Sequence, residues 1–191
     1  MKSTCIKSVM LIGICALGFS QNTEAQSTYT ISDSKANDMK LSGTSSMHDW
    51  DMNAHVFAGE AQFDLEKKGG GEQITALNSL TFSLLTTNLK SDKKGLDKNA
   101  YEALKSKSHK DIHYKLLSSK VSSGNDGKFL INAIGNLTIA GITREVTMDV
   151  YCIVNSNSTI SCSGSDKLKM TDYKIEPPSF MFGAMKTGDD V

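Results

Sequence analysis

A two-residue alternation of apolar and polar side chains runs through most of the chain and constrains its fold more than any other feature. Residues 144–154 give the clearest run, in which the apolar side chains fall on even positions: Val146, Met148, Val150 and Val154. Similar runs lie at 55–65, 80–84, 112–116 and 129–139. Because side chains two apart on a strand share a face, each run predicts a half-buried β-strand.

Short turn segments separate these runs at 67–72, 122–127, 140–141 and 155–158. Such connections join antiparallel neighbours, and the glycine inside the 129–139 run, Gly135, suits a strand that bends in a barrel. A hydrophobic content of 39% supplies a core but excludes a membrane-embedded chain. The sequence therefore predicts an all-β, antiparallel, barrel-like domain.

One helix is expected between strands, at residues 97–107. Leu96, Ala100 and Leu104 recur every four residues there. A single amphipathic helix cannot make an α/β fold, so this short inserted helix is expected to lie across one end of the sheet or barrel. Its apolar stripe is read as packing rather than as a surface for a partner.

The first 25 residues have the pattern of a secretory signal. Lys2 and Lys7 precede an apolar run at 9–19, and Thr23 and Ala25 are small residues that suit cleavage before Gln26. The predicted division is a signal peptide at 1–25 and a mature domain at 26–191, periplasmic or secreted, with no transmembrane segment after cleavage. Lipidation at Cys15 is the alternative.

Charge and cysteine content agree with a small exported domain. The 21 basic residues balance the 21 acidic ones, so formal charge gives no reason to expect a nucleic-acid partner. Cys152 and Cys162 remain after cleavage, and a hairpin centred near Asn157 would place them opposite each other. A disulfide between them is expected, with two buried, reduced thiols as the alternative.

No familiar catalytic or metal-binding template fits the sequence. The four histidines form no H-E-x-x-H motif and lack acidic or cysteine ligands at zinc spacing, so we expect no metal, cofactor or enzymatic activity. The densest polar cluster is residues 43–50, which contains His48, Asp49 and Trp50. It is interpreted as a structural turn whose Ser, His and Asp side chains satisfy backbone groups while Trp50 packs against the barrel. The alternative is an acid/base pair of His48 and Asp49.

Four ordered segments resemble the YceI-like family of secreted lipid- or polyisoprenoid-binding proteins. They are residues 43–50 (G-T-S-S-M-H-D-W), 96–105 (L-D-K-N-A-Y-E-A-L-K), 135–146 (G-N-L-T-I-A-G-I-T-R-E-V) and 169–189. The resemblance covers nearly all of the mature chain. It implies a lipocalin-like barrel of about eight strands around an apolar pocket. Family members generally continue past the last segment with a final alternating strand, so this barrel is expected to have a truncated last strand and an open edge, and a truncated gene sequence is the alternative.

The inward-facing side chains are the candidate ligand contacts if the barrel is hollow, and core residues if it is filled. An apolar loop near the chain end, at 177–182, is a candidate lid or a rigid packed loop. The predicted ligand-binding residues are Phe57, Phe63, Phe82, Ile112, Tyr114, Ile131, Leu137, Ile139, Val146, Met148, Val150, Phe180 and Phe182.

The sequence leaves three candidate functions for this protein. The first is a carrier for an apolar isoprenoid or lipid. The second is a noncatalytic interaction module, with a possible homodimer formed through an open barrel edge. The third, and least favoured, is an enzyme built around His48 and Asp49.

Overall fold

The structure is a computed structural model that describes residues 25–31, 37–123, 127–180 and 185–191. The predicted signal peptide lies outside the described residues, except for Ala25. Strands dominate the described chain and a single α-helix accompanies them, so the predicted all-β class is confirmed.

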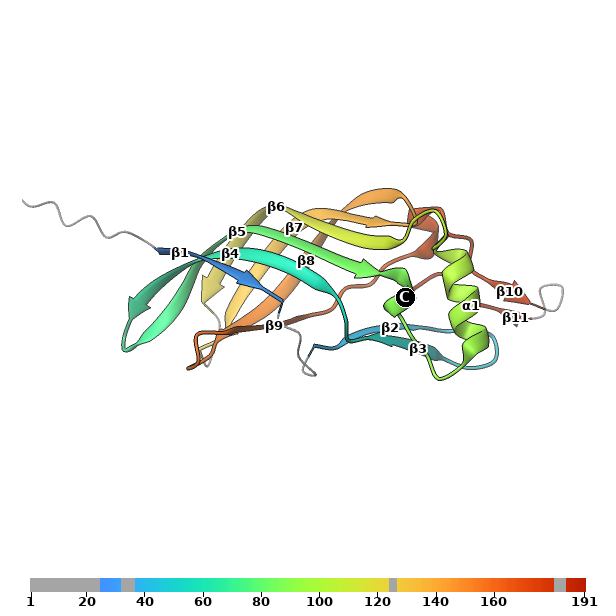
Figure 1. Ribbon diagram of the computed structural model, residues 1–191, viewed down its shortest axis with the longest axis horizontal. Helices are drawn as coiled ribbons and strands as arrows, with labels where there is room; N and C mark the ends of the chain where they lie inside the picture. The colour runs from blue at the N-terminus through green and yellow to red at the C-terminus, as the bar shows by residue number, and fades with distance from the viewer. Residues whose placement is uncertain (1–24, 32–36, 124–126, 181–184) are drawn as a thin grey trace, which may run out of the picture.

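The main element is one antiparallel sheet that curls into half a barrel (Figure 1). Each strand from β5 to β9 pairs with the strand before it in the sequence, as the short turns predicted for every pair except β5 and β6, whose connection contains α1. In spatial order the strands are β1 (Ala25–Thr30), β4 (Ala58–Lys68), β5 (Gly71–Leu85), β6 (Asp111–Ser123), β7 (Phe129–Ile139), β8 (Ile142–Val154) and β9 (Ile160–Gly164).

Two hairpins of this sheet turn over two residues each. Gly69 and Gly70 link β4 to β5 with φ of 62° and 85°. Ala140 and Gly141 link β7 to β8 with φ of 49° and 79°. Positive φ at both positions is the type I′ geometry that matches the twist of paired strands, so these turns fix the register on either side.

Irregular pairing bends the sheet. The register between β4 and β5 shifts next to Phe63, and that between β6 and β7 shifts after the pair of Leu116 and Gly135. Bulges of this kind increase local twist and curvature. The predicted bend at Gly135 therefore lies beside a register shift.

Two short ribbons and two 3₁₀ turns complete the described fold. The first ribbon lies beneath the curled sheet in Figure 1, and its strand β3 forms a bridge from Asn53 to Lys90. The ribbons are β2 (Met39–Gly43) with β3 (Trp50–Ala54), and β10 (Ser179–Phe180) with β11 (Met185–Lys186); the turns are η1 (Thr86–Asn88) and η2 (Met170–Tyr173).

The helix α1 (Lys94–Ala103) lies across one end of the sheet, as expected, but both of its predicted ends were wrong. It begins three residues early because the carbonyl of Lys93 accepts the N–H groups of Leu96 (2.9 Å) and Asp97 (3.1 Å). It ends before Lys105, which takes a left-handed φ of 53°.

The buried side chains form two clusters at opposite ends of the curled sheet. The helix-side cluster comprises Met52, Ala54, Leu84, Leu89, Leu104, Ala140, Tyr173 and Ile175. The far cluster comprises Phe63, Ile74, Leu77, Phe129, Ile131, Ala133 and Cys152. Strand β7 contributes to both, because Ile131 belongs to the far cluster while Leu137 and Ile139 pack against the helix-side one. The inner face of the sheet thus contributes side chains to two separate apolar clusters.

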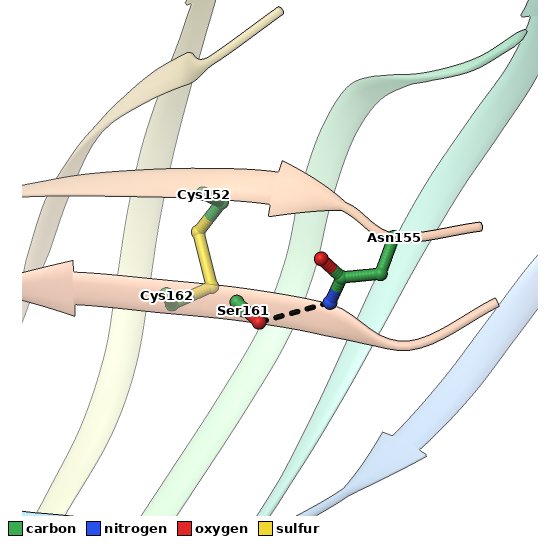
Figure 2. Close-up of a disulfide and its surroundings, with 4 residues drawn as sticks. All are labelled: Cys152, Asn155, Ser161 and Cys162. Carbon is green, nitrogen blue, oxygen red and sulfur yellow. Dashed lines mark hydrogen bonds between the residues drawn. A yellow bond between two sulfur atoms is a disulfide. The ribbon is translucent and has the colours of Figure 1, made fainter. Parts of the chain in front are cut away.

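The predicted disulfide is confirmed in the β8–β9 hairpin (Figure 2). Cys152 and Cys162 are direct cross-strand partners with Cα atoms 4.2 Å apart. The amide of Asn155 at the turn donates to the hydroxyl of Ser161 on the opposite strand (2.9 Å). The bridge ties the edge strand β9 to the sheet.

Candidate ligand pocket

A pocket of about 960 Å³ lies between the concave face of the sheet, the β2–β3 ribbon, α1 and the segment around η2. Ligand pockets for small molecules commonly measure about 300–1,000 Å³, so this one lies near the upper end of that range. The interior is neither completely filled nor completely hollow, the two alternatives that the sequence left open. The far cluster fills one end, and the pocket occupies the middle and the helix side.

The sheet supplies the apolar floor of the pocket. The alternation predicted from sequence brings these side chains to the inner face, since they occupy matching positions on neighbouring strands. The floor residues are Leu80, Phe82 and Leu84 on β5, Ile112 and Tyr114 on β6, Leu137 and Ile139 on β7, and Met148 and Val150 on β8.

The opposite wall comes from elements that the sequence did not assign to a ligand site. Met39, Leu41 and Met52 of the β2–β3 ribbon line the pocket together with Leu89. The helix contributes the stripe of Leu96, Ala100 and Ala103, followed by Leu104. The stripe was read as packing, and it does pack against the helix-side cluster, but the same side chains also line the pocket.

All the charged side chains among the described lining residues are exposed. His48 and Lys93 are two of them, and the Nε2 atom of His48 lies 3.4 Å from Nζ of Lys93. Met47, at 67% exposure, adds an apolar side chain beside them. The polar groups thus surround an apolar interior.

The turn at 43–50 is held by Ser45 and Trp50. The Ser45 hydroxyl donates to the carbonyl of His48 (2.7 Å), and the Trp50 indole N–H donates to the carbonyl of Thr44 (3.1 Å). Gly43 pairs with Trp50, whose ring leaves no room for a Cβ at that position. The side chains of His48 and Asp49 are exposed and make no hydrogen bond to described backbone groups, which differs from the expected turn.

Many of the predicted ligand residues line the pocket: Phe82, Ile112, Tyr114, Leu137, Ile139, Met148 and Val150. Phe63 and Ile131 do not, because their positions farther along the strands place them in the far cluster. Phe57 packs on the helix-side cluster, its ring centroid 5.4 Å from that of Phe82. Val146 lines a separate polar hollow beside Arg144 and Asp172. Phe182 and the side chain of Phe180 lie outside the described residues.

Two tyrosines are the buried polar groups of the pocket. Tyr114 and Tyr173 are 4% and 2% exposed, and neither hydroxyl has a hydrogen-bond partner among the described residues. Burial raises the pKa of both phenols, and the carboxylates of Asp172 and Asp166 add to the increase in the pKa of Tyr173. Both hydroxyls therefore stay protonated at neutral pH and can donate a hydrogen bond.

The described residues contain no group of three or more His, Cys, Asp or Glu side chains arranged to hold a metal ion. Within the same residues, no helix has the length and apolar character needed to cross a membrane.

A curled antiparallel sheet that encloses an apolar pocket defines a binding protein of the β-barrel class. A sequence model of the YceI-like domain matches residues 22–191. The chain belongs to the YceI-like family, which is known for barrel proteins that bind polyisoprenoids.

The solved structure of a similar protein agrees with this fold. BcnA of Burkholderia cenocepacia is 16% identical, with a TM-score of 0.56 over 80% of this chain and 93% of BcnA. A YceI protein of Campylobacter jejuni is also 16% identical, with a TM-score of 0.48 over 70% of this chain and 75% of that protein. No curated protein matches the chain.

Proposed function

We propose that this protein binds an apolar isoprenoid or lipid chain in the pocket and carries or sequesters it. The observation that carries the proposal is the pocket of about 960 Å³, whose charged lining residues are all exposed among the described residues and whose buried lining is apolar apart from two tyrosines. Membership of the YceI-like family supports the same ligand class.

Hydrophobic transfer is the driving force. Each buried CH₂ contributes about 0.8 kcal/mol, and the ordering of a flexible chain offsets part of that gain. The residues on the floor and on the helix stripe exclude water from the chain, while the exposed side chains of His48 and Lys93 remain solvated. Binding of this kind requires no covalent step, and we assign no catalytic role to His48 or Asp49.

The proposed compartment is the periplasm or the cell exterior. The signal-like pattern at 1–25 and the Cys152–Cys162 disulfide support export, because disulfides persist in oxidising compartments. Cleavage after Ala25 would leave Gln26–Thr30 of β1 paired with β4.

The test is a titration of the purified protein with squalene, a linear isoprenoid hydrocarbon, followed by the fluorescence of Trp50. Trp50 is the only tryptophan of the chain and lines the pocket. Ala100→Phe adds a ring to the helix stripe inside the pocket, so it should weaken binding about tenfold or more.

Lys98→Phe is the matched control, because the Lys98 side chain on the same helix is 75% exposed. We expect it to leave the affinity unchanged. Equal affinity of both variants and the wild type would place the ligand elsewhere and contradict the proposal.

A further inference from the structure

Leu80 on β5 and Val150 on β8 lie where the pocket meets the far cluster. Both side chains line the pocket, and both also pack against the far cluster. Among the described residues, no other partly or fully buried hydrophobic side chain does both. These two side chains therefore mark the boundary between the hollow part of the half-barrel and its filled part.

The far cluster fills the concave face beyond this boundary. Its members Phe63, Leu77 and Ile131 are 5%, 7% and 1% exposed, and none of them lines the pocket. They come from three different strands, β4, β5 and β7, so their side chains meet across the concave face. Because packed protein interiors leave few voids, a chain lying in the pocket has to end against this cluster.

Strand pairing fixes the position of both boundary residues. Val150 pairs with Ile131 on β7, a member of the far cluster. Leu80 pairs with Ala61 on β4, which packs against the same cluster. Two strands separate β5 from β8 in the sheet, yet the curl brings β5 and β8 into contact. The boundary is therefore built from both sides of the curl.

The disulfide holds the same boundary at the edge of the sheet. Cys152 belongs to the far cluster, and its partner Cys162 on β9 lines the pocket. Two residues farther along β9, Gly164 pairs with Val150 and also lines the pocket. The covalent bond between direct cross-strand partners prevents the edge strand from sliding along β8, so the lining beside Val150 keeps its position.

We propose that Leu80 and Val150 set the maximum length of the apolar chain that the pocket can bury. An apolar chain gains affinity only from the carbon atoms that it removes from water, and carbon atoms beyond the boundary would have to displace the far cluster. This inference rests on the proposed function, because it concerns a chain bound in the same pocket. It adds selection by length to a site that otherwise selects only apolar ligands.

The experiment measures the affinity of the full mature chain for linear polyprenols of about three to about ten isoprene units, followed by the fluorescence of Trp50. Each added unit should tighten binding about tenfold or more until the chain fills the pocket. Beyond that limiting length, the affinity of the wild type should stay constant, because further units remain in water.

Two variants should move the limiting length in opposite directions. Leu80→Ala combined with Val150→Ala removes as many carbon atoms as one isoprene unit contains, so the limiting length should increase by about one unit. Val150→Phe fills the closed end of the pocket, so the limiting length should decrease by about one unit. Because Val150→Phe leaves no cavity, it tests the inference even where the double alanine variant fails to fold.

Leu77→Ala is the matched control. Leu77 lies on the same strand as Leu80 and would lose the same carbon atoms, but it is buried in the far cluster and does not line the pocket. We expect this variant to be less stable than the wild type and to keep the same limiting length.

Three results would overturn the inference while leaving the proposed function intact, since the pocket would still bind polyprenols. They are an unchanged limiting length in both pocket variants, an equal change in Leu77→Ala, and an affinity that rises through the whole series for the wild type. Failure of the wild type to bind a polyprenol of any length would overturn the proposed function as well.

Discussion

At the scale of single residues, the absence of a side chain at Gly135 makes room for Tyr114, which lines the pocket. A Cβ there would collide with the ring of Tyr114, and the backbone of Gly135 does not take a positive φ. The glycine is therefore required by a close approach rather than by a special backbone conformation. Gly135 also lies beside a register shift between β6 and β7, where the sheet bends.

Gly135→Ala should destabilise the protein by about 1–3 kcal/mol, since the ring of Tyr114 must move to accept the methyl group. Urea unfolding followed by circular dichroism measures the difference. Gly71→Ala is the control, because a Cβ at Gly71 would meet nothing within 4 Å. An equal change in the unfolding free energy of both variants would contradict the role given to the Tyr114 ring.

At the scale of elements, η2 is attached to the end of the chain through Asp189. The carboxylate accepts one hydrogen bond from the hydroxyl of Thr171 and another from the backbone N–H of the same residue. Both bonds lower the pKa of Asp189, and the bond from the hydroxyl has the larger effect. Leu168 and Val191 exchange backbone hydrogen bonds of 2.9 Å in both directions beside this contact. The wall that carries Tyr173 thus depends on a partly exposed carboxylate.

A lowered pKa in the folded state means that Asp189 stabilises the fold above its unfolded pKa and loses this contribution as the pH falls through its folded pKa. We expect the Asp189 carboxyl to titrate below the ordinary range for aspartate in the wild type. Thr171→Val removes the largest cause and should move the pKa back toward that range. NMR titration of the carboxyl carbon measures both values, and an unchanged pKa in Thr171→Val would refute the assignment.

The elements also show how far sequence reasoning reaches in this fold. Alternation identified the inner-face residues of β5 to β8 correctly, because a period of two fixes which face a side chain occupies. It could not distinguish Ile131 from Leu137, which share a face of β7 but lie in the far cluster and on the pocket floor respectively. Which of these two regions a β7 side chain enters depends on its position along the strand, because the elements that cover each end of the sheet come from other parts of the sequence.

Sequence reasoning missed the opposite wall of the pocket for the same reason, because that wall is placed by elements far away in the sequence. Met39, Leu41 and Met52 lie on the β2–β3 ribbon, whose position over the concave face comes from tertiary pairing such as the bridge from Asn53 to Lys90. The helix stripe was found from its spacing, but the same pattern serves core packing and ligand contact. A signal did exist for Tyr114, because a tyrosine among apolar inner-face residues brings a hydroxyl that needs a partner.

At the scale of the whole molecule, the half-barrel combines a filled end and a hollow one. The far cluster and the disulfide consolidate one end of the sheet, while α1, the β2–β3 ribbon and η2 enclose the pocket at the other. Rigid packing at one end allows the other to stay open without loss of the fold, since each region has its own buried contacts. This division is the structural basis for the proposed binding function.

The central claim is that the pocket holds an apolar chain, and mass spectrometry of the native protein tests it most directly. The full chain with its own signal is expressed in a bacterial host, purified from the periplasm without detergent, and extracted with organic solvent. We predict a polyprenyl or acyl compound, present at close to one molecule per protein, and absent from Ala100→Phe protein purified in parallel. A folded wild-type protein that yields no such compound and takes up none from added lipid would contradict the account.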